Sequence, residues 1–366
     1  MLLIDNETVA ALLDMPSCIE AQEAAFRQIP DGGAAFRGRI DMYAPCERPD
    51  GYYRWGTMEG YNDGILAIRI KSDVMTWPRD ENGRWTEDKY CVEPGTYCGL
   101  IFLWSALNGE PLAIVNDGVL QHMRVGGGAG IGVKHLSRPD ASVVAMLGSG
   151  GMARTYLEAI CAVRGISEVR VYSPTRANRE RYAAEMTGRL AVPVLPADTP
   201  EAAIADADIV ASATDSMEPT FDPAWLEPGM HVTNLGPDEV SPAALERFDV
   251  KIRQGIPGIR MKESARMQPG IGHSPMAVLA GTEEELKRLP PRRERDIYLE
   301  EFPTYCDLVT GKAPGRTAAD QITFYQNTGF QGLQFSSVGG LVYRKAREAG
   351  LGREIPTAWF LQDIRD

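Results

Sequence analysis

The spacing of apolar residues predicts a helix at the start of the chain and short strands after it. Residues 5–28 carry apolar side chains on one helical face, with Pro16 placed after Asp14 as at a helix N-terminus. The next stretch changes to short apolar alternations that are typical of strands. These strands are predicted at residues 39–43, 52–57, 65–72, 100–104 and 111–115. The polar segment 75–99 is rich in Trp, Pro and Gly, and its length predicts a flap or an oligomer contact.

From residue 143 onward the pattern alternates between strands and helices, which is typical of a doubly wound parallel sheet. Strands are predicted at residues 143–147, 168–172, 192–195, 209–214, 231–235, 248–252 and 322–325. Helices are predicted at residues 153–163, 177–186, 200–205 and 335–349. Segment 254–295 interrupts the alternation and is predicted to be an irregular insertion with a surface helix.

Residues 143–153 combine an apolar strand, a glycine turn and the start of a helix. The turn has the form G-x-G-x-x-A, from Gly148 through Gly150 to Ala153. In a dinucleotide-binding turn the first glycine makes the bend, the second lets the backbone approach a pyrophosphate, and the third small residue allows helix and strand to pack closely. A second glycine cluster within residues 119–135 follows no apolar strand, so it predicts a helix whose small-residue face packs against a neighbour.

Composition and charge argue against several classes of partner and function. The chain has 366 residues, 44% of them hydrophobic, and a net charge of −12, which argues against nucleic acid or an anionic membrane as partner. No signal peptide and no membrane-spanning run is predicted. The six cysteines lack C-x-x-C spacing, so we expect no metal site and a cytoplasmic protein with reduced thiols.

The end of the second predicted strand of the parallel sheet bears on the choice of cofactor. In NAD enzymes an acid about twenty residues after the glycines binds the ribose 2′-hydroxyl. Here Ser173, Thr175 and Arg176 occupy that region without an acid, and Arg179 lies one turn further. Hydroxyls and a guanidinium suit a 2′-phosphate, which favours NADP(H) over NAD(H). The alternative is that Ser173 and Thr175 only cap the following helix.

Several charged residues are candidates for binding a ligand or for catalysis. Arg39 and Arg124 are predicted to clamp a carboxylate. Lys71 is an odd charge in an apolar strand and is a candidate for proton transfer if it points inward, whereas an ordinary strand lysine faces solvent. Asp238 follows a strand at the edge where a nicotinamide would bind; it is either a proton relay or an ordinary loop acid. His122 is expected to play a supporting role or a structural one, beside Arg124 rather than on its helical face.

Four stretches resemble the ornithine cyclodeaminase and mu-crystallin family. They are G-S-G-G-M-A at residues 148–153, Ala211–Thr214, Asn234–Asp238 and Asn327–Gly329, the last leading into a helix. The resemblance implies a substrate site made by Arg39, Met58, Lys71 and Arg124, with Asp238 as the acid after the fifth strand. The chain departs from the family around the second arginine, where Gln121 and His122 stand before it, and near the C-terminal helix, where Leu333 and Gln334 replace common acids.

The resemblance also implies an architecture. A Rossmann domain at residues 126–315 would be joined to an α+β substrate-binding and dimerisation domain made by residues 1–125 and 316–366, in a homodimer. The predicted catalytic residues are Lys71 and Asp238. The predicted cofactor-binding residues are Gly148, Ser149, Gly150, Gly151, Met152, Ala153, Ser173, Thr175, Arg176, Thr214 and Gly236.

The function predicted from these residues is an NADP(H)-dependent oxidoreductase that acts on a C–N bond. It would reduce an imino acid (a ketimine) or dehydrogenate an amino acid. One alternative is cyclodeamination of L-ornithine to L-proline and ammonia; another, of a different class, is a nucleotide-bound ligand-binding protein without catalysis. Trp77, Trp85 and Tyr90 of the long polar segment are predicted to wall a pocket larger than ornithine needs.

Overall fold

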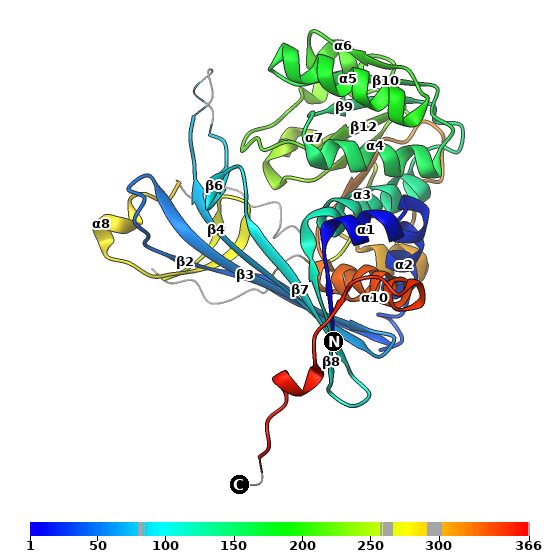
Figure 1. Cartoon of the computed structure of the whole chain (residues 1–366). Coiled ribbons are helices and arrows are strands. Elements are labelled where there is room, and N and C mark those ends of the chain that lie inside the picture. Colours follow the sequence, from blue (N-terminus) through cyan, green and yellow to red (C-terminus); the bar gives the residue numbers. More distant parts are fainter. Residues whose placement is uncertain (80–82, 84, 257, 259–265, 291–301, 365–366) are drawn as a thin grey trace.

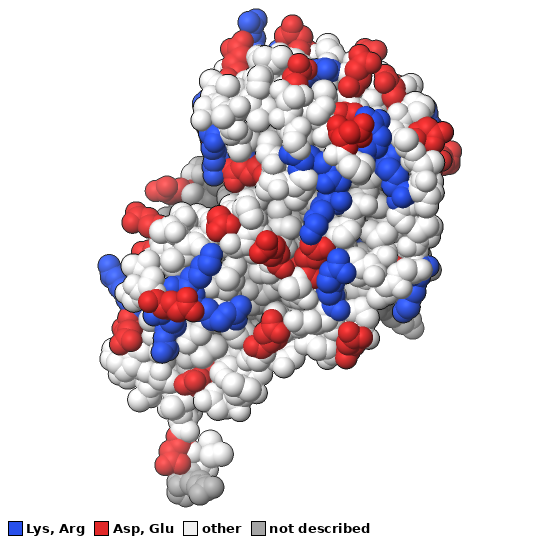
Figure 2. Space-filling model, turned by 90° about the vertical axis from the view of Figure 1, so that its right-hand side faces the viewer, with Lys and Arg blue, Asp and Glu red and all other residues white. Residues whose placement is uncertain are grey.

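The computed structural model describes residues 1–79, 83, 85–256, 258, 266–290 and 302–364. It contains two sheets in two lobes, with helices α1, α2, α3 and α10 at their junction (Figure 1). The bounds of these helices are Asn6–Leu12, Met15–Arg27, Asp117–Leu136 and Gln331–Ala349. No helix in the described ranges is both long and apolar enough to cross a bilayer. On the face shown in Figure 2, acidic and basic side chains are interspersed.

The parallel sheet has seven strands in the order β11-β10-β9-β12-β13-β17-β14. Its strands are β9 (Val143–Leu147), β10 (Glu168–Tyr172), β11 (Val194–Pro196), β12 (Ile209–Ser212), β13 (His231–Asn234), β14 (Val250–Arg253) and β17 (Thr323–Gln326). The helices that connect them are α4 (Gly151–Val163), α5 (Arg176–Leu190), α6 (Pro200–Ile204), α7 (Pro242–Arg247) and α9 (Tyr305–Val309), with 3-10 turns η1 (Pro223–Trp225) and η2 (Pro237–Glu239). Every neighbouring pair of strands is parallel, which confirms the predicted doubly wound fold.

The large sheet runs in the order β15-β16-β2-β3-β4-β7-β8-β1-β18, with β5 and β6 attached at β4. Its strands are β1 (Leu2–Ile4), β2 (Ala34–Ala44), β3 (Gly51–Asn62), β4 (Ile65–Thr76), β5 (Asp88–Cys91), β6 (Glu93–Pro94), β7 (Cys98–Ser105), β8 (Pro111–Asn116), β15 (Met267–Ile271), β16 (Ser274–Leu279) and β18 (Arg353–Glu354). Helix α10 packs across β3 and β4, and together with α2 it covers a core of buried apolar side chains.

Helix α3 carries the second glycine cluster and confirms the predicted small-residue face. A Cβ on Gly126 would collide with the backbone of Thr155 on α4, and one on Gly130 would lie 3.0 Å from Ala159. The missing side chains therefore let α3 and α4 approach closely. Because both helices border the parallel sheet, this contact fixes α3, and with it Arg124, against the glycine turn.

Two expectations about elements were wrong. The single helix expected over residues 5–28 is two helices, because Leu13 ends α1 and the Asp14 carboxylate accepts a hydrogen bond from the Ser17 amide to start α2. Segment 254–295 is not irregular throughout: β15 and β16 form a hairpin, and β16 pairs parallel with β2. The surface helix there is only α8 (Glu283–Leu286), and residues 291–295 lie outside the described part of the chain. By sheet membership, β15 and β16 belong with the large sheet and β17 with the parallel sheet.

Candidate active site

The glycine turn after β9 has the backbone that a pyrophosphate site requires. Gly148 has φ +109°, and a Cβ there would collide with the carbonyl of Ala213. A Cβ on Gly150 would meet nothing within 4 Å, so the backbone is open at this point. Helix α4 begins at the next residue with no side-chain cap on its amides. Open amides at the start of a 13-residue helix suit an anionic group.

The other predicted residues of the turn pack inside the lobe that contains the parallel sheet. Ala153 is fully buried and its carbonyl accepts a hydrogen bond from Tyr182, 2.9 Å away. Met152 packs partly against the same core. Beneath Gly151 lies His122 of α3, whose Nε2 would be 2.8 Å from an added Cβ. Burial lowers the pKa of His122, which disfavours the charged imidazole where it meets the turn.

The residues predicted to choose between cofactors lie at the end of β10. The Ser149 hydroxyl donates to the Ser173 hydroxyl at 3.0 Å, which joins the two loops. Thr175 is the N-cap residue of α5, but its side chain makes no capping hydrogen bond. The Arg176 side chain is exposed and pairs with Glu180 at 2.7 Å. Arg179 instead turns inward to the Ser173 carbonyl and Asp198.

At the ends of β12 and β13 the structure adds a residue that sequence reasoning missed. Glu239 is fully buried and accepts hydrogen bonds from the amide and hydroxyl of Thr214, at 2.6 and 2.7 Å. Its other oxygen accepts from the amides of Leu235 and Gly236. Glu239 thus locks together the two loops that carry the predicted cofactor residues. Asp238, next to it in η2, is partly exposed and lines a pocket of about 130 Å³ beside Met217 and Val240.

On the large sheet, Lys71 points inward. Its side chain is 12% exposed, and its Nζ lies 3.1 Å from Asp73 and 5.3 Å from the centre of the Tyr97 ring. The residues opposite Lys71 on the neighbouring strands are Gly56 and Gly99. A Cβ on either glycine would collide with a carboxylate, that of Asp41 or that of Asp117. The two glycines therefore leave room for these carboxylates on both sides of the lysine.

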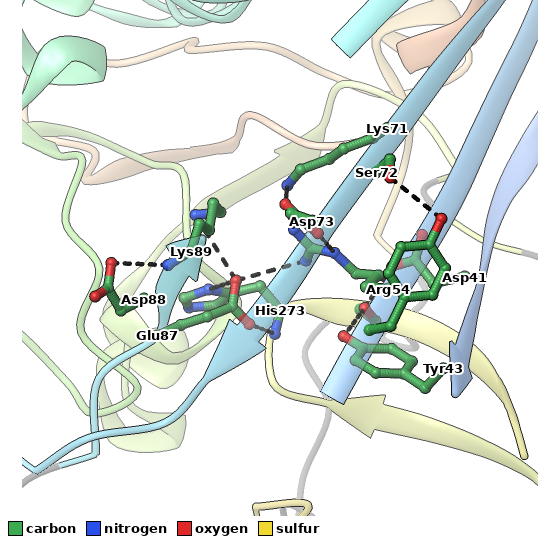
Figure 3. Close-up of polar contacts among 12 residues, drawn as sticks. Asp41, Tyr43, Arg54, Lys71, Ser72, Asp73, Glu87, Asp88, Lys89 and His273 are labelled. Carbon is green, nitrogen blue, oxygen red and sulfur yellow. Dashed lines mark hydrogen bonds and ion pairs between the residues drawn. The ribbon is translucent and has the colours of Figure 1, made fainter. Parts of the chain in front are cut away.

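Burial and the charge of Arg54 hold the pKa of Lys71 well below its usual range, although Asp73 opposes the shift. Burial opposes ionisation of Asp73, but Lys71 and Arg54 lower the pKa of Asp73 to about 2. Arg54 donates two hydrogen bonds to Asp73, at 2.8 and 2.6 Å (Figure 3). The lysine and arginine therefore compete for one carboxylate.

Arg124 on α3 is the second cationic centre. It is buried, and among the described residues its hydrogen-bond partners are the side-chain oxygens of Gln121 and Gln334, each at 2.8 Å. Its guanidinium lies 4.9 Å from the centre of the Phe335 ring. Burial, with the nearby charge of Arg69, lowers the pKa of Arg124 to about 9. A buried guanidinium held by neutral amides has charge to offer an anionic ligand.

Arg69 connects the two centres, and sequence reasoning missed it. It pairs with Asp117, and its guanidinium lies 5.7 Å from the ring centre of Tyr97 and 5.6 Å from that of Phe335. Lys71 shares the first ring and Arg124 the second. The structure thus places both predicted residues around Arg69.

Arg39 and Met58 complete the predicted substrate set. Arg39 forms a two-point ion pair with Asp41, at 2.9 and 2.5 Å, so its fork is already occupied. Its charge still acts on Arg124. Met58 is 3% exposed and lies opposite Arg69 in the strand register.

Arg69 and Asp73, which sequence reasoning missed, had a signal in the sequence. Together with Lys71 they alternate with uncharged residues, so the three share one face of β4.

The three aromatic residues predicted to wall a pocket lie in two different places. Trp77 is buried in a small core with Tyr43 and Ile271, and Trp85 packs against that core. Tyr90 instead stacks with Arg48. The backbone of Trp85 accepts a hydrogen bond from the Met217 amide at 3.4 Å, so the long polar segment contacts the parallel-sheet lobe.

The parallel sheet and its glycine turn define a dinucleotide-binding fold of the Rossmann type. The chain belongs to the ornithine cyclodeaminase/mu-crystallin family, whose model matches residues 2–350, and this confirms the predicted family.

Individual relatives agree with this assignment. The chain is 32% identical over 260 residues to a Rhizobium meliloti protein whose name provisionally assigns it to the dehydrogenases, covering 69% of this chain and 72% of that protein. It is 26% identical over 298 residues to a Delta(1)-pyrroline-2-carboxylate reductase of Bacillus cereus, covering 81% and 83%. The Thermococcus litoralis Delta(1)-pyrroline-2-carboxylate reductase, solved with NADH and L-proline, has the same fold, with a TM-score of 0.73, 23% identity and coverage of 97% and 100%.

Proposed function

We propose that this protein reduces an imino acid to the amino acid with NADPH. The observation that carries the proposal is Arg124, a buried guanidinium whose described partners are the two neutral amides of Gln121 and Gln334. Such a charge is best satisfied by a carboxylate that arrives with the substrate. The similarity to Delta(1)-pyrroline-2-carboxylate reductases supports a substrate in which the carboxylate lies next to a C=N bond.

The reaction adds one hydride to the imine carbon and one proton to its nitrogen. The hydride would come from a reduced nicotinamide cofactor held at the glycine turn and the start of α4, which would be oxidised in exchange. In our proposal Arg124 holds the carboxylate, with Arg39 and Met58 beside it, and Lys71 donates the proton to nitrogen. The low pKa of Lys71, caused by burial and Arg54, makes its proton easier to give up. Asp238, in η2 after β13, is the alternative donor.

The residues around the turn have proposed roles in holding the cofactor. The uncapped amides at the start of α4, after Gly150, would bind the pyrophosphate, and Thr214 and Gly236, fixed by Glu239, would border the nicotinamide. Thr175 has a hydroxyl free of capping, and Arg176 is exposed beside it. Both support a 2′-phosphate site, and so a preference for NADPH over NADH.

The test is a substrate panel. Purified protein is mixed with NADPH or NADH and with cyclic and open-chain imino acids, each paired with the same imine lacking its carboxylate. We expect net oxidation of NADPH, faster than of NADH, with carboxylated imines. Ammonia release from L-ornithine without net cofactor change would instead establish a cyclodeaminase.

The matched variant is Arg124→Gln, which removes the charge. We expect it to lower kcat/KM for the carboxylated imine about 10- to 100-fold and to leave the carboxylate-free analogue nearly unchanged, because only the first loses a charged hydrogen bond. An equal loss with both imines would show that Arg124 does not bind the carboxylate.

We also propose that the protein is a cytoplasmic homodimer. All six cysteines are free thiols, which supports a reducing compartment. The solved archaeal alanine dehydrogenase with the same fold is a dimer, which supports the oligomeric state. Light scattering of the purified protein would test it.

A further inference from the structure

Behind Lys71 a chain of alternating charges runs across the large sheet (Figure 3). Lys71 contacts Asp73 at 3.1 Å, Asp73 accepts both hydrogen bonds of Arg54, and the far side of Arg54 lies 3.7 Å from Glu87. Glu87 in turn lies 3.2 Å from Nδ1 of His273. The side chains of Arg54, Asp73 and Glu87 are each no more than 2% exposed. Buried charges at these distances interact strongly because water screens them little.

The far end of the chain is supplied by two segments distant in sequence. Glu87 comes from the long polar segment, and His273 comes from the turn between β15 and β16. The His273 amide donates to Glu87 at 3.0 Å, in addition to the ring contact. Gly272 has φ +53°, and a Cβ there would lie 2.5 Å from Glu87 and 2.8 Å from Trp77 Nε1. The turn therefore fits closely around the carboxylate and fixes its position.

Charged and titratable groups reach Lys71 from every element around it. They are Asp41 on β2, Arg54 on β3, Arg69 and Asp73 on β4, Lys89 on β5, Tyr97 before β7 and Asp117 on α3. Asp41 and Asp117 are paired with Arg39 and Arg69. Asp73 is thus the carboxylate that Lys71 contacts directly, and Arg54 is its competitor for that carboxylate.

We propose that Arg54 and Glu87 are positioning residues that set the charge state of Lys71 through Asp73. Arg54 draws the Asp73 carboxylate away from Lys71, which favours the neutral amine. Glu87, held by His273, offsets part of the charge of Arg54 and moderates this effect. As the proton donor of the proposed reduction, Lys71 would then give up its proton more readily than an exposed lysine; this last step rests on the proposed function.

The charge state of Lys71 is measured directly by competitive acetylation. The full-length protein is treated with a trace of acetic anhydride at a series of pH values, and acetylation at Lys71 is read from peptide masses against an added free amine. We expect Arg54→Gln to move the midpoint for Lys71 up by about one pH unit, because a positive charge is lost. Glu87→Gln should move it down, because a negative charge is lost.

Arg54→Lys is the control, because it keeps the charge and should keep the midpoint within a few tenths of a pH unit of the native one. Shifts of Arg54→Gln and Glu87→Gln in the same direction, or no shift in either, would overturn the proposal. If Arg54→Gln does not fold, Glu87→Gln decides alone: a downward shift supports the proposal, and an unchanged or higher midpoint overturns it.

Activity provides a separate readout. If Lys71 is the proton donor, turnover falls as pH rises through its pKa, and the alkaline limb of kcat moves in the same directions as the acetylation midpoint. Opposite acetylation shifts in a protein that reduces no imine would uphold this proposal and reject the proposed function. An imine reductase without those shifts would do the reverse.

Discussion

At the scale of the residue, Gln334 is the hydrogen-bond partner of Arg124 that differs from the family pattern, because the resemblance implies an acid near the C-terminal helix. Gln334 accepts a hydrogen bond from Arg124 at 2.8 Å and donates one to Gln22 at 2.6 Å. An acid at this position would pair with the guanidinium inside the protein. The neutral amide orients Arg124 without neutralising it, which leaves its charge for the carboxylate of the proposed substrate.

Gln334→Glu tests this reasoning. We expect the new carboxylate to compete with the substrate, so that KM for the carboxylated imine rises about tenfold while kcat changes little, because a charge-assisted hydrogen bond is at stake. Steady-state kinetics measures both constants. Gln121→Glu offers a second carboxylate to the same guanidinium and should act in the same direction. Unchanged KM values in both variants would contradict the role given to Arg124.

Sequence reasoning found the residues whose type is unusual in their local sequence. It missed the residues whose importance comes from a contact with a distant part of the chain. Lys71 stands out as a charge in an apolar strand, and its inward orientation agrees with that hypothesis. Arg54 and Glu87 are ordinary charged residues in the sequence, and they meet only because β3 and the long polar segment converge. Likewise, Asp238 attracted attention after β13, while the buried acid that joins the loops is Glu239.

At the scale of the element, a glycine in α3 allows close helix packing, whereas a glycine in α5 does not have this role. A Cβ on Gly126 would collide with the backbone of Thr155, whereas one on Gly188, inside α5, would meet nothing within 4 Å. We therefore expect Gly126→Ala to destabilise the protein by about 1–3 kcal/mol through overpacking. Gly188→Ala should stabilise it by about 0.5–1 kcal/mol through helix propensity. Thermal and urea unfolding compare the two, and equal effects would reject the packing argument.

Most strands of the parallel sheet were predictable because they are short apolar runs, and β9 and β10 are each followed by a long helix. The hairpin of β15 and β16 was not, because Pro269, Gly270, Gly272 and Pro275 give its sequence the look of a loop. Its pairing with β2 joins residues more than two hundred positions apart. Such pairing depends on tertiary contacts that local propensity does not contain.

At the scale of the whole molecule, the long polar segment links the two lobes. Thr86 forms an isolated bridge with Ser216, and the next residue, Glu87, belongs to the charge chain behind Lys71. Thr214, at the other end of that short loop, is a predicted cofactor residue tied to Glu239. One segment therefore contacts both the loop beside the predicted cofactor site and the charges behind the proposed proton donor.

The stability of the whole molecule should depend on pH through His231, which lies in the parallel sheet. It is fully buried, and its Nδ1 lies 2.9 Å from the Thr323 hydroxyl of β17. Burial, with the charge of Arg316 nearby, lowers its pKa from 6.5 to about 3. Between these values the unfolded chain binds a proton that the folded one does not. The folded state is therefore fully favoured above pH 6.5 and loses roughly 1.4 kcal/mol for each unit of pH below it.

His231→Asn isolates this contribution, because an amide keeps a hydrogen bond to Thr323 but does not titrate. We expect the free energy of unfolding of the native protein to fall between pH 7 and 5 by about 2 kcal/mol more than that of the variant. Urea unfolding at the two pH values measures the difference. His231→Gln, a second amide that does not titrate, should lose the same part of the pH dependence. A variant with the same pH dependence as the native protein would mean that the imidazole is protonated in the fold, and that β13 tolerates its charge.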